Sequence, residues 1–213
     1  ARAAPPPPAR GAARACGSGP HPLNDFFDGV KRWARRDAAP GDAAALLARA
    51  ETLLESCPER YLDLASAVAA LGLAPQTVAG FAAEAARVCR ARLAEDPDAA
   101  LAAFAILSEL QCQQVADMAA IGEAIEGRLR SYPVAALSDA LPRIRDSHVS
   151  LALQAEVSRR LQDLPPGDLA SFAVRMAAQK SVDPAAAERV AHGLVEAEPR
   201  LGLPGLSDAV VAT

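Results

Sequence analysis

The chain has 213 residues and a formal net charge of −4, and 51% of its residues are hydrophobic although only 4% are aromatic. Ala alone accounts for 52 residues, and Ala has the lowest helix penalty of any residue, whereas β-branched and aromatic side chains favour strands. The composition therefore excludes a sheet-dominated fold, and the mildly acidic balance argues against a polyanion binder that acts by net charge.

Residues 1–20 form an Arg-, Pro- and Ala-rich arm with three Arg and no acid. The arm has too few large apolar groups to offset the entropy of ordering, so we expect it to be extended or disordered by itself. Acid-poor, Arg-rich N-termini are typical of organellar transit peptides, which predicts a mitochondrial (matrix) protein, with a plastid location as the alternative. The arm is then a presequence remnant, an ordinary low-complexity extension, or a functional arm that orders on RNA or on a neighbouring subunit.

Residues 21–213 are predicted to form one helical-repeat domain, because similar segments recur after proline. These segments start near 22, 58, 97, 133, 166 and 204, with an average spacing just above 36 residues. Pro suits the first turn of a helix, where its missing N–H would be unsatisfied anyway. Each unit contains a second amphipathic segment, and the five are Gly41–Ser56, Gln76–Glu95, Gln114–Arg130, Val149–Gln162 and Asp183–Ala197.

Helical periodicity within the second segments supports this organisation. In the third unit, apolar residues recur close to helical spacing at Val115, Met118, Ile121, Ile125 and Leu129. Ser147, Asp183 and Ser207 are predicted N-caps. The expected fold class is all-α, an α-solenoid of about five helical hairpins with a truncated sixth. The alternative is an irregular α-bundle in which Pro only marks helix starts.

One segment, residues 161–201, contains a recognisable sequence motif. Its features are a Leu-Pro-x-x-Leu-Ala opening at Leu164, Pro165 or Pro166, Leu169 and Ala170, an Ala-rich first helix, and a turn at Asp183. This segment resembles one repeat of the octotricopeptide and heptatricopeptide groups, which are organellar helical-hairpin proteins related to the FAST-kinase and RAP-domain proteins. The resemblance implies an organellar RNA binder, and some members of these families are built into mitochondrial ribosomes. The mild acidity of this chain departs from the pattern.

Arginines that recur in the second segments are the first candidate RNA contacts. They are Arg49, Arg87, Arg90, Arg92, Arg128, Arg130, Arg159, Arg160 and Arg189. Stacked hairpins would align them as a ladder that contacts phosphates at intervals. In the alternative interpretation they stabilise helix C-termini and are neutralised by nearby acids. These acids are Glu84, Glu95, Glu126, Glu156 and Glu188. Pairing of the arginines with acids would weigh against RNA binding.

A denser basic cluster lies in the first unit. It consists of Lys31, Arg32, Arg35 and Arg36 around Trp33. In one interpretation Trp33 stacks on a base while Arg32 and Arg36, four residues apart, grip phosphate from one helix face. In the other, Trp33 belongs to the core face of the first hairpin with Phe26 and Val30, and the basic residues are solvated. We favour the core interpretation for Trp33.

Motifs for catalysis and cofactor binding are missing from the sequence. The three His lie in different units without a carboxylate or Cys at ligand spacing, and the four Cys are too far apart for a CxxC site. There is no GxxxxGK[ST], GxGxxG or GxSxG motif. The sequence predicts no enzyme activity, no metal or other cofactor and no small-molecule substrate. It also predicts no membrane insertion, because the apolar runs are too short for a span.

The sequence therefore predicts a non-catalytic, RNA-binding helical-repeat scaffold of mitochondria. Its expected role is that of a structural component of the mitochondrial ribosome, in contact with rRNA and neighbouring proteins. One alternative is a structural subunit of a respiratory or ATP synthase complex without nucleic acid. Another is a free organellar RNA-processing factor.

Overall fold

The computed structural model describes residues 22–35, 41–179 and 181–201, and every regular element in these ranges is helical. The ten α-helices are α1 (Pro22–Ala34), α2 (Asp42–Ser56), α3 (Tyr61–Ala70), α4 (Pro75–Arg92), α5 (Ala100–Glu109), α6 (Val115–Glu126), α7 (Val134–Ala140), α8 (Ser147–Arg159), α9 (Pro166–Ala177) and α10 (Pro184–Leu201). Short 3-10 helices are η1 (Pro58–Arg60), η2 (Pro97–Ala99), η3 (Leu129–Ser131), η4 (Leu141–Arg143) and η5 (Leu161–Asp163). The all-α prediction is confirmed for this part of the chain. The predicted arm at 1–20 and the segment from 204 onward lie outside it.

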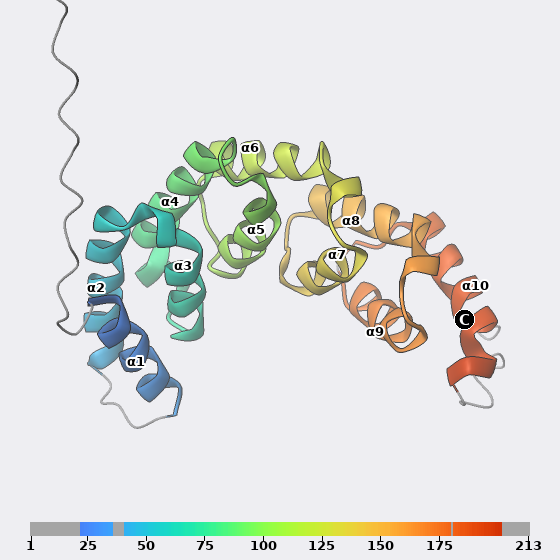
Figure 1. Ribbon diagram of the computed structural model, residues 1–213, viewed down its shortest axis with the longest axis horizontal. Coiled ribbons are helices and arrows are strands. Elements are labelled where there is room, and N and C mark those ends of the chain that lie inside the picture. The colour runs from blue at the N-terminus through green and yellow to red at the C-terminus, as the bar shows by residue number, and fades with distance from the viewer. Residues whose placement is uncertain (1–21, 36–40, 180, 202–213) are drawn as a thin grey trace, which may run out of the picture.

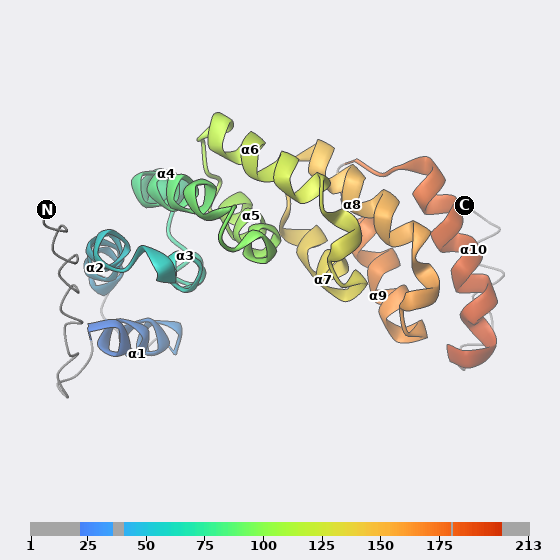
Figure 2. The same cartoon turned by 45° about the horizontal axis from the view of Figure 1, so that its top comes forward.

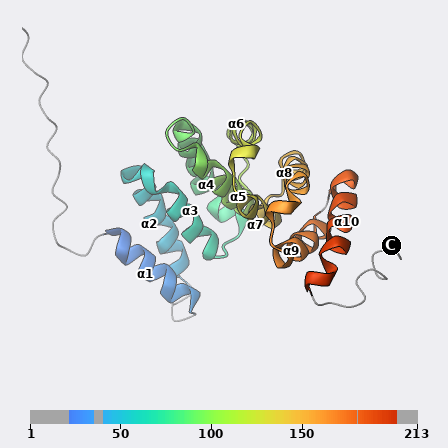
Figure 3. The ribbon, with the colours of Figure 1, turned by 45° about the vertical axis from the view of Figure 1, so that its right-hand side comes forward.

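The helices form a curved row in sequence order (Figure 1). Each odd-numbered helix packs on the even-numbered helix that follows it, from α1 with α2 to α9 with α10. Odd-numbered helices also contact the next odd-numbered helix and even-numbered helices the next even-numbered one, which gives an inner and an outer line. The turned views in Figures 2 and 3 show the same succession of helix pairs. The row thus gives the chain a concave side lined by the odd-numbered helices.

Prolines lie where the odd-numbered helices begin, as the repeat analysis predicts. Pro22 and Pro166 are the first residues of α1 and α9, and Pro133 precedes α7 as its N-cap residue. Pro58 and Pro97 each open a 3-10 turn that leads into α3 and α5. The missing N–H of Pro costs nothing at such positions.

Helix ends differ from the predictions in a few places. The segment predicted to continue to Arg130 ends as α6 at Glu126, and the chain continues from Leu129 as η3. Gly127 follows α6 directly, and the low helix propensity of Gly favours a stop there. Similarly, α4 ends at Arg92 instead of Glu95.

The cap of α8 is Asp146, so the prediction of Ser147 as its N-cap is wrong. Asp146 Oδ1 accepts hydrogen bonds from the backbone N–H groups of His148 at 2.9 Å and Val149 at 3.0 Å. A carboxylate also favours the positive end of the helix dipole. For α10 the prediction is confirmed, because Asp183 Oδ1 accepts from the N–H of Ala185 at 3.2 Å. Ser207 lies outside the described residues.

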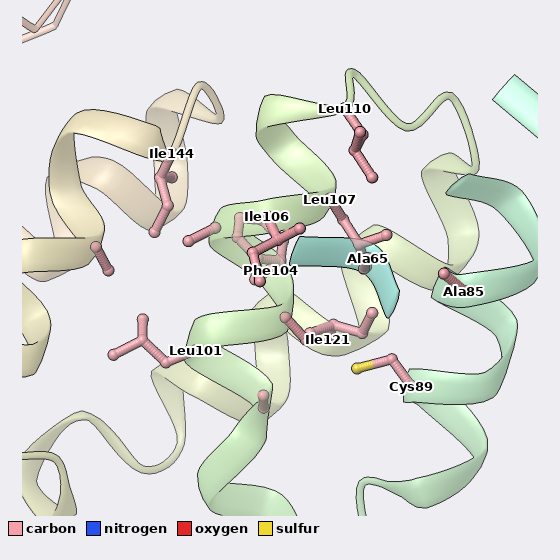
Figure 4. Close-up of a cluster of buried hydrophobic side chains, with 14 of the residues drawn as sticks. Ala65, Ala85, Cys89, Leu101, Phe104, Ile106, Leu107, Leu110, Ile121 and Ile144 are labelled. Atoms are coloured by element: carbon pink, nitrogen blue, oxygen red, sulfur yellow. The ribbon is translucent and has the colours of Figure 1, made fainter. Parts of the chain in front are cut away.

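The core runs between the inner and outer lines of helices. Its largest fully buried side chains include Phe26, Phe81, Phe104 and Phe172, which come from α1, α4, α5 and α9. Figure 4 shows Phe104 among aliphatic side chains of α5 and α6, close to Ala65 of α3. Many Ala residues are also buried, so small side chains allow the helices to approach closely. The high Ala content therefore has a direct packing role.

Gly122 of α6 is a point of close approach between three helices. A Cβ at this position would lie 3.1 Å from Val149 Cγ2 and 3.6 Å from Phe104 Cε2. The absence of a side chain thus lets α6 contact both α5 and α8 at one point.

A buried polar seam joins α8 to the turn before α10. Gln154 is fully buried, and its Nε2 donates to the Ser181 carbonyl at 2.9 Å and to Ser150 Oγ at 3.2 Å. Its Oε1 accepts from the Asp183 N–H at 3.0 Å. Within the described ranges, no buried side-chain N or O atom is left without a hydrogen bond. One amide therefore fixes the conformation of the α9–α10 turn.

Two buried titratable groups predict a loss of stability at alkaline pH. Burial raises the pKa of the Cys89 thiol to about 11, and burial also raises the pKa of the neighbouring Tyr61 hydroxyl above its usual range. Above about pH 9 the unfolded chain loses the thiol proton while the folded chain keeps it, so unfolding becomes easier as pH rises. We expect the free energy of unfolding to be level up to about pH 8.5 and then to fall by about 2 kcal/mol through the thiol as pH approaches the folded pKa.

Urea titrations at neutral and alkaline pH measure this loss. In Cys89→Ala the part due to the thiol should disappear, so the fall between the two pH values becomes smaller. An identical alkaline fall in the variant and in the unmodified chain would contradict the assignment to Cys89.

Candidate nucleic-acid interface

Several arginines form ion pairs that join neighbouring helix pairs. Arg90 on α4 donates to Asp117 on α6 at 2.8 Å, and Arg143 on η4 donates to Glu109 on α5 at 2.6 Å. Arg175 on α9 bonds to Asp139 on α7. These ion pairs neutralise the cation and also link one helix pair to the next.

Other members of the predicted ladder pair with acids close by. Arg87 donates to Glu84 at 2.8 Å, Arg159 donates to Glu156 at 2.8 Å, and Arg128 donates to Asp98 at 3.0 Å. Arg49 and Arg92 pair with Asp25 and Glu95. Glu84, Glu95 and Glu156 therefore act as the neutralising acids that the alternative interpretation predicts.

Two of the predicted acids behave differently. Glu126 lies 2.7 Å from His148 Nδ1 and takes no part in an arginine pair within the described residues. In the same part of the chain, Glu188 has no ion pair. The ladder is thus neutralised partly by acids from other helices, such as Asp98 and Asp117.

Arg160 and Arg189 are tied into the structure by several contacts. Arg160 Nη1 donates to the Tyr132 carbonyl at 3.0 Å and to the Arg130 carbonyl at 3.4 Å, and its Nε donates to Asp163 at 3.2 Å. Arg189 on α10 donates to Ser158 Oγ on α8 at 2.8 Å. Of the predicted ladder, only Arg130 is exposed and without an ion pair among the described side chains.

The basic cluster of α1 contains cations that are not engaged in ion pairs with described residues. Lys31 pairs with Asp28 at 3.1 Å, whereas Arg32 and Arg35 are exposed and have no ion pair in the described part of the chain. Arg36 lies outside the described residues. The C-terminal end of α1 therefore presents at least two cations that are free to bind an anionic partner.

Trp33 belongs to the core, as the favoured interpretation predicts. Its ring is half-buried against the apolar cluster, and its Nε1 donates to the Leu71 carbonyl at 3.1 Å. Phe26 and Val30 are buried on the same helix. The carbonyl lies next to Gly72, which adopts the left-handed φ of 63° that glycine tolerates well. The indole therefore fixes the turn between α3 and α4 and is not free to stack on a base.

Among the described surface side chains without an ion pair, carboxylates outnumber cations. Among described side chains, the cations without an ion pair are Arg32, Arg35, Arg130 and Arg145. The exposed carboxylates without an ion pair or a capping role are Glu51, Glu55, Glu59, Glu123, Asp168 and Glu188. A continuous phosphate-binding track therefore does not form along the described helices.

Hollows lie at several places on the described surface. One of about 590 Å³ lies between α5 and α7 on the concave side, with Asp98, Asp139 and Arg143 around an Ala-rich floor. Another of about 500 Å³ lies beside α10, and one of about 410 Å³ lies among α5, α6 and the turn that precedes α8. Three or more His, Cys, Asp or Glu side chains do not gather as metal ligands in the described ranges. None of the helices described here is long and apolar enough to cross a membrane.

The repeat spacing contains a signal for ion pairs that sequence analysis missed. Arg143 and Glu109 are 34 residues apart, and Arg175 and Asp139 are 36 apart, close to the spacing of about 36 residues that the sequence predicts for a repeat. An acid and an arginine one period apart come together when successive helix pairs stack. Asking which opposite charges recur one period apart would have found both pairs.

Comparison with known proteins adds no relative. No family model matches the chain, and no curated protein or solved structure matches it either. The geometry of the described residues therefore carries the functional argument.

Proposed function

We propose that this chain is a non-catalytic helical-repeat scaffold that acts by binding neighbouring proteins in a large assembly. In this proposal the described helix pairs are successive repeats of an α-solenoid, and the curved row offers partners an inner and an outer surface. The observation that carries the proposal is the pairing of the repeat arginines with acids. Cations engaged in this way stabilise the row and leave few free charges for a nucleic acid.

The charge balance supports protein partners over RNA as the main ligand. Binding to a phosphate backbone depends on cations that replace counterions, and each phosphate contact needs an available Lys or Arg. Arg90, Arg128 and Arg159 each have a carboxylate within 3.0 Å. Phosphate would have to displace these carboxylates, which makes the ladder a poor RNA track.

A second candidate function is a local contact with RNA through the end of α1. Arg32 and Arg35 are exposed and without ion pairs among described residues, next to Lys31. Such a contact fits a component of the mitochondrial ribosome, held mainly by proteins and touching rRNA at one end. The matrix location rests on the acid-poor arm at 1–20 and on the resemblance of 161–201 to organellar repeats. A respiratory or ATP synthase assembly remains the alternative without RNA.

Sedimentation of the tagged full-length chain in a mitochondrial extract tests the proposal. We expect the chain to sediment with a large assembly, and the double variant Arg32→Glu/Arg35→Glu to keep this position, because proteins hold the scaffold. Sedimentation as a free chain before any treatment would contradict the proposal. If the chain leaves the assembly only after ribonuclease treatment or in the double variant, RNA contact through α1 is the principal function instead.

A further inference from the structure

The helix α9 has one side without a neighbour of its own line, at the end of the row (Figure 1). The helices α3, α5 and α7 each pack between two other odd-numbered helices, whereas α9 packs on α7 alone among the odd-numbered helices that the structure describes. The side of α9 that faces away from α7 is therefore a surface on which a further helix could pack.

A shared motif relates α9 to α5, which has a neighbour on both sides. The spacing Leu101-x-x-Phe104 of α5 recurs in α9 as Leu169-x-x-Phe172. All four of these side chains are buried. Because both helices use the same two positions for the core, the side of α5 that contacts α7 predicts the corresponding side of α9.

Three residues of α5 lie toward α7. Ala102 and Ala105 line the hollow between the two helices, and Glu109 accepts a hydrogen bond from Arg143 of η4 at 2.6 Å. Counted from the shared motif, the residues of α9 that match these three are Ala170, Ala173 and Ala177.

Contacts of Arg175 confirm that this side of α9 faces away from α7. Arg175 donates to Ser138 Oγ of α7 at 3.2 Å and also bonds to Asp139. Successive residues of a helix are about 100° apart, so Ala173 and Ala177, two residues before and after Arg175, lie on the opposite side. Ala173 is half-buried and Ala177 is exposed.

The helix α10 extends this uncovered surface. Arg189 of α10 donates to Ser158 Oγ of α8 at 2.8 Å, so Ala191, two residues later, lies on the side away from α8. One turn further, Val195 is 42% exposed. We name the uncharged surface formed by both helices the open end, and its residues are Ala170, Ala173, Ala177, Ala191 and Val195.

We infer that residues 204–213 cover the open end as the first helix of a sixth unit. These residues lie outside the described part of the chain, and their sequence identifies them as the occupant. The inference goes beyond the proposed scaffold function and does not depend on it, because the contact is made within the chain.

A motif of α7 recurs in this segment. Residues 206–210 read Leu-Ser-Asp-Ala-Val, and residues 137–141 read Leu-Ser-Asp-Ala-Leu. In the structure Leu137, Ala140 and Leu141 are buried between neighbouring helices, and the Asp139 side chain is 71% exposed. The same pattern at 206–210 predicts a helix that buries Leu206, Ala209 and Val210, which helical spacing places on one face.

The start and length of the segment also suit an odd-numbered helix. Pro204 and Gly205 repeat the Pro166–Gly167 pair with which α9 begins. Ten residues make a helix as long as α3 or α5. The match with α7 places Ser207 inside this helix, where Ser138 lies in α7, instead of at the N-cap that its residue type alone predicts.

The chemistry of the two surfaces is complementary. Alanines at the open end let a second helix approach closely, and Leu206 and Val210 supply the apolar volume that the alanines lack. The open end offers no cation to a phosphate or a carboxylate, because its five residues are uncharged. An apolar helix face therefore fits it better than an anionic ligand does.

Hydrogen exchange of the full-length chain, followed by mass spectrometry, tests this inference. We expect the amides of residues 206–213 to exchange at least tenfold more slowly in the unmodified chain than in Val210→Asp, since a carboxylate cannot be buried against the open end. Ala177→Glu, on the other side of the contact, should speed up exchange in the same segment to a similar extent.

Two matched controls place a carboxylate beside the contact. Val211→Asp changes the next valine, which matches the exposed Pro142 of η4, and Ala185→Glu changes an exposed alanine of α10 outside the open end. Both should keep exchange of residues 206–213 within about twofold of the unmodified chain. Circular dichroism checks that all four variants retain their helix content.

Three results would overturn the inference. The first is exchange of residues 206–213 in the unmodified chain as fast as in Val210→Asp. The second is an equal effect of Ala177→Glu and Ala185→Glu. The third is sedimentation equilibrium of the unmodified chain as a dimer that Ala177→Glu converts to a monomer, because the open end then binds a second copy.

Discussion

Phe104→Ala is expected to lower the free energy of unfolding by about 4 kcal/mol, which is the largest effect of any single truncation proposed for this chain. The Phe104 ring is 1% exposed and lies where α5 contacts α6, against the bare backbone of Gly122. Removing the ring leaves a cavity that the rigid approach of the helices prevents from closing. Urea or thermal unfolding, followed by circular dichroism, measures the change.

A control for this variant is Val174→Ala, because Val174 is 71% exposed. Its effect should stay within about 0.5 kcal/mol, as for most surface substitutions. If Phe104→Ala changed the unfolding midpoint no more than Val174→Ala does, the packing of α5 on α6 described here would be wrong.

Gln154→Leu is expected to lower the free energy of unfolding by about 3 kcal/mol. Leu fills a similar volume, but it leaves the Ser181 carbonyl and the Asp183 N–H without the hydrogen bonds that Gln154 provides. Each buried polar group that loses its partner costs about 1–3 kcal/mol. The effect should concentrate at the α9–α10 turn, so amide hydrogen exchange there should speed up more than in α3 or α4.

The matched control is Gln76→Leu, at an exposed position in the first turn of α4. Its unfolding free energy should remain close to that of the unmodified chain. Equal losses in the two variants would show that glutamine at 154 has no special role in fixing the turn.

Much of the fold follows from local sequence chemistry. Proline marks the starts of the odd-numbered helices because its geometry suits a first turn, and small or apolar residues at helical spacing mark the faces that pack. The ends are less certain, since Gly127 stops α6 before the predicted end at Arg130. The sequence predicts the cap of α8 one residue late because Asp146 and Ser147 are both good caps, and only backbone geometry distinguishes them.

The candidate site is harder to predict, because it depends on contacts between residues far apart in sequence. The composition shows that arginine is frequent, but whether Arg90 faces phosphate or Asp117 depends on how α4 packs on α6. The exposure of Val115 has the same origin, since helical periodicity does not specify where a neighbouring helix stops covering a face. The core position of Trp33 is predictable, because Phe26 and Val30 on the same helix face mark that face as apolar.

The row of helix pairs also has a mechanical consequence. The two helices of each pair pack on one another and on the helices of the adjacent pairs. A small rotation between two adjacent pairs therefore does not require the contacts between other pairs to break. Small rotations of the same sense add along the row and change the distance between α1 and α10 more than any single interface changes. We therefore expect the described helix pairs to move as units, and the distance between α1 and α10 to vary more than the packing within any one pair.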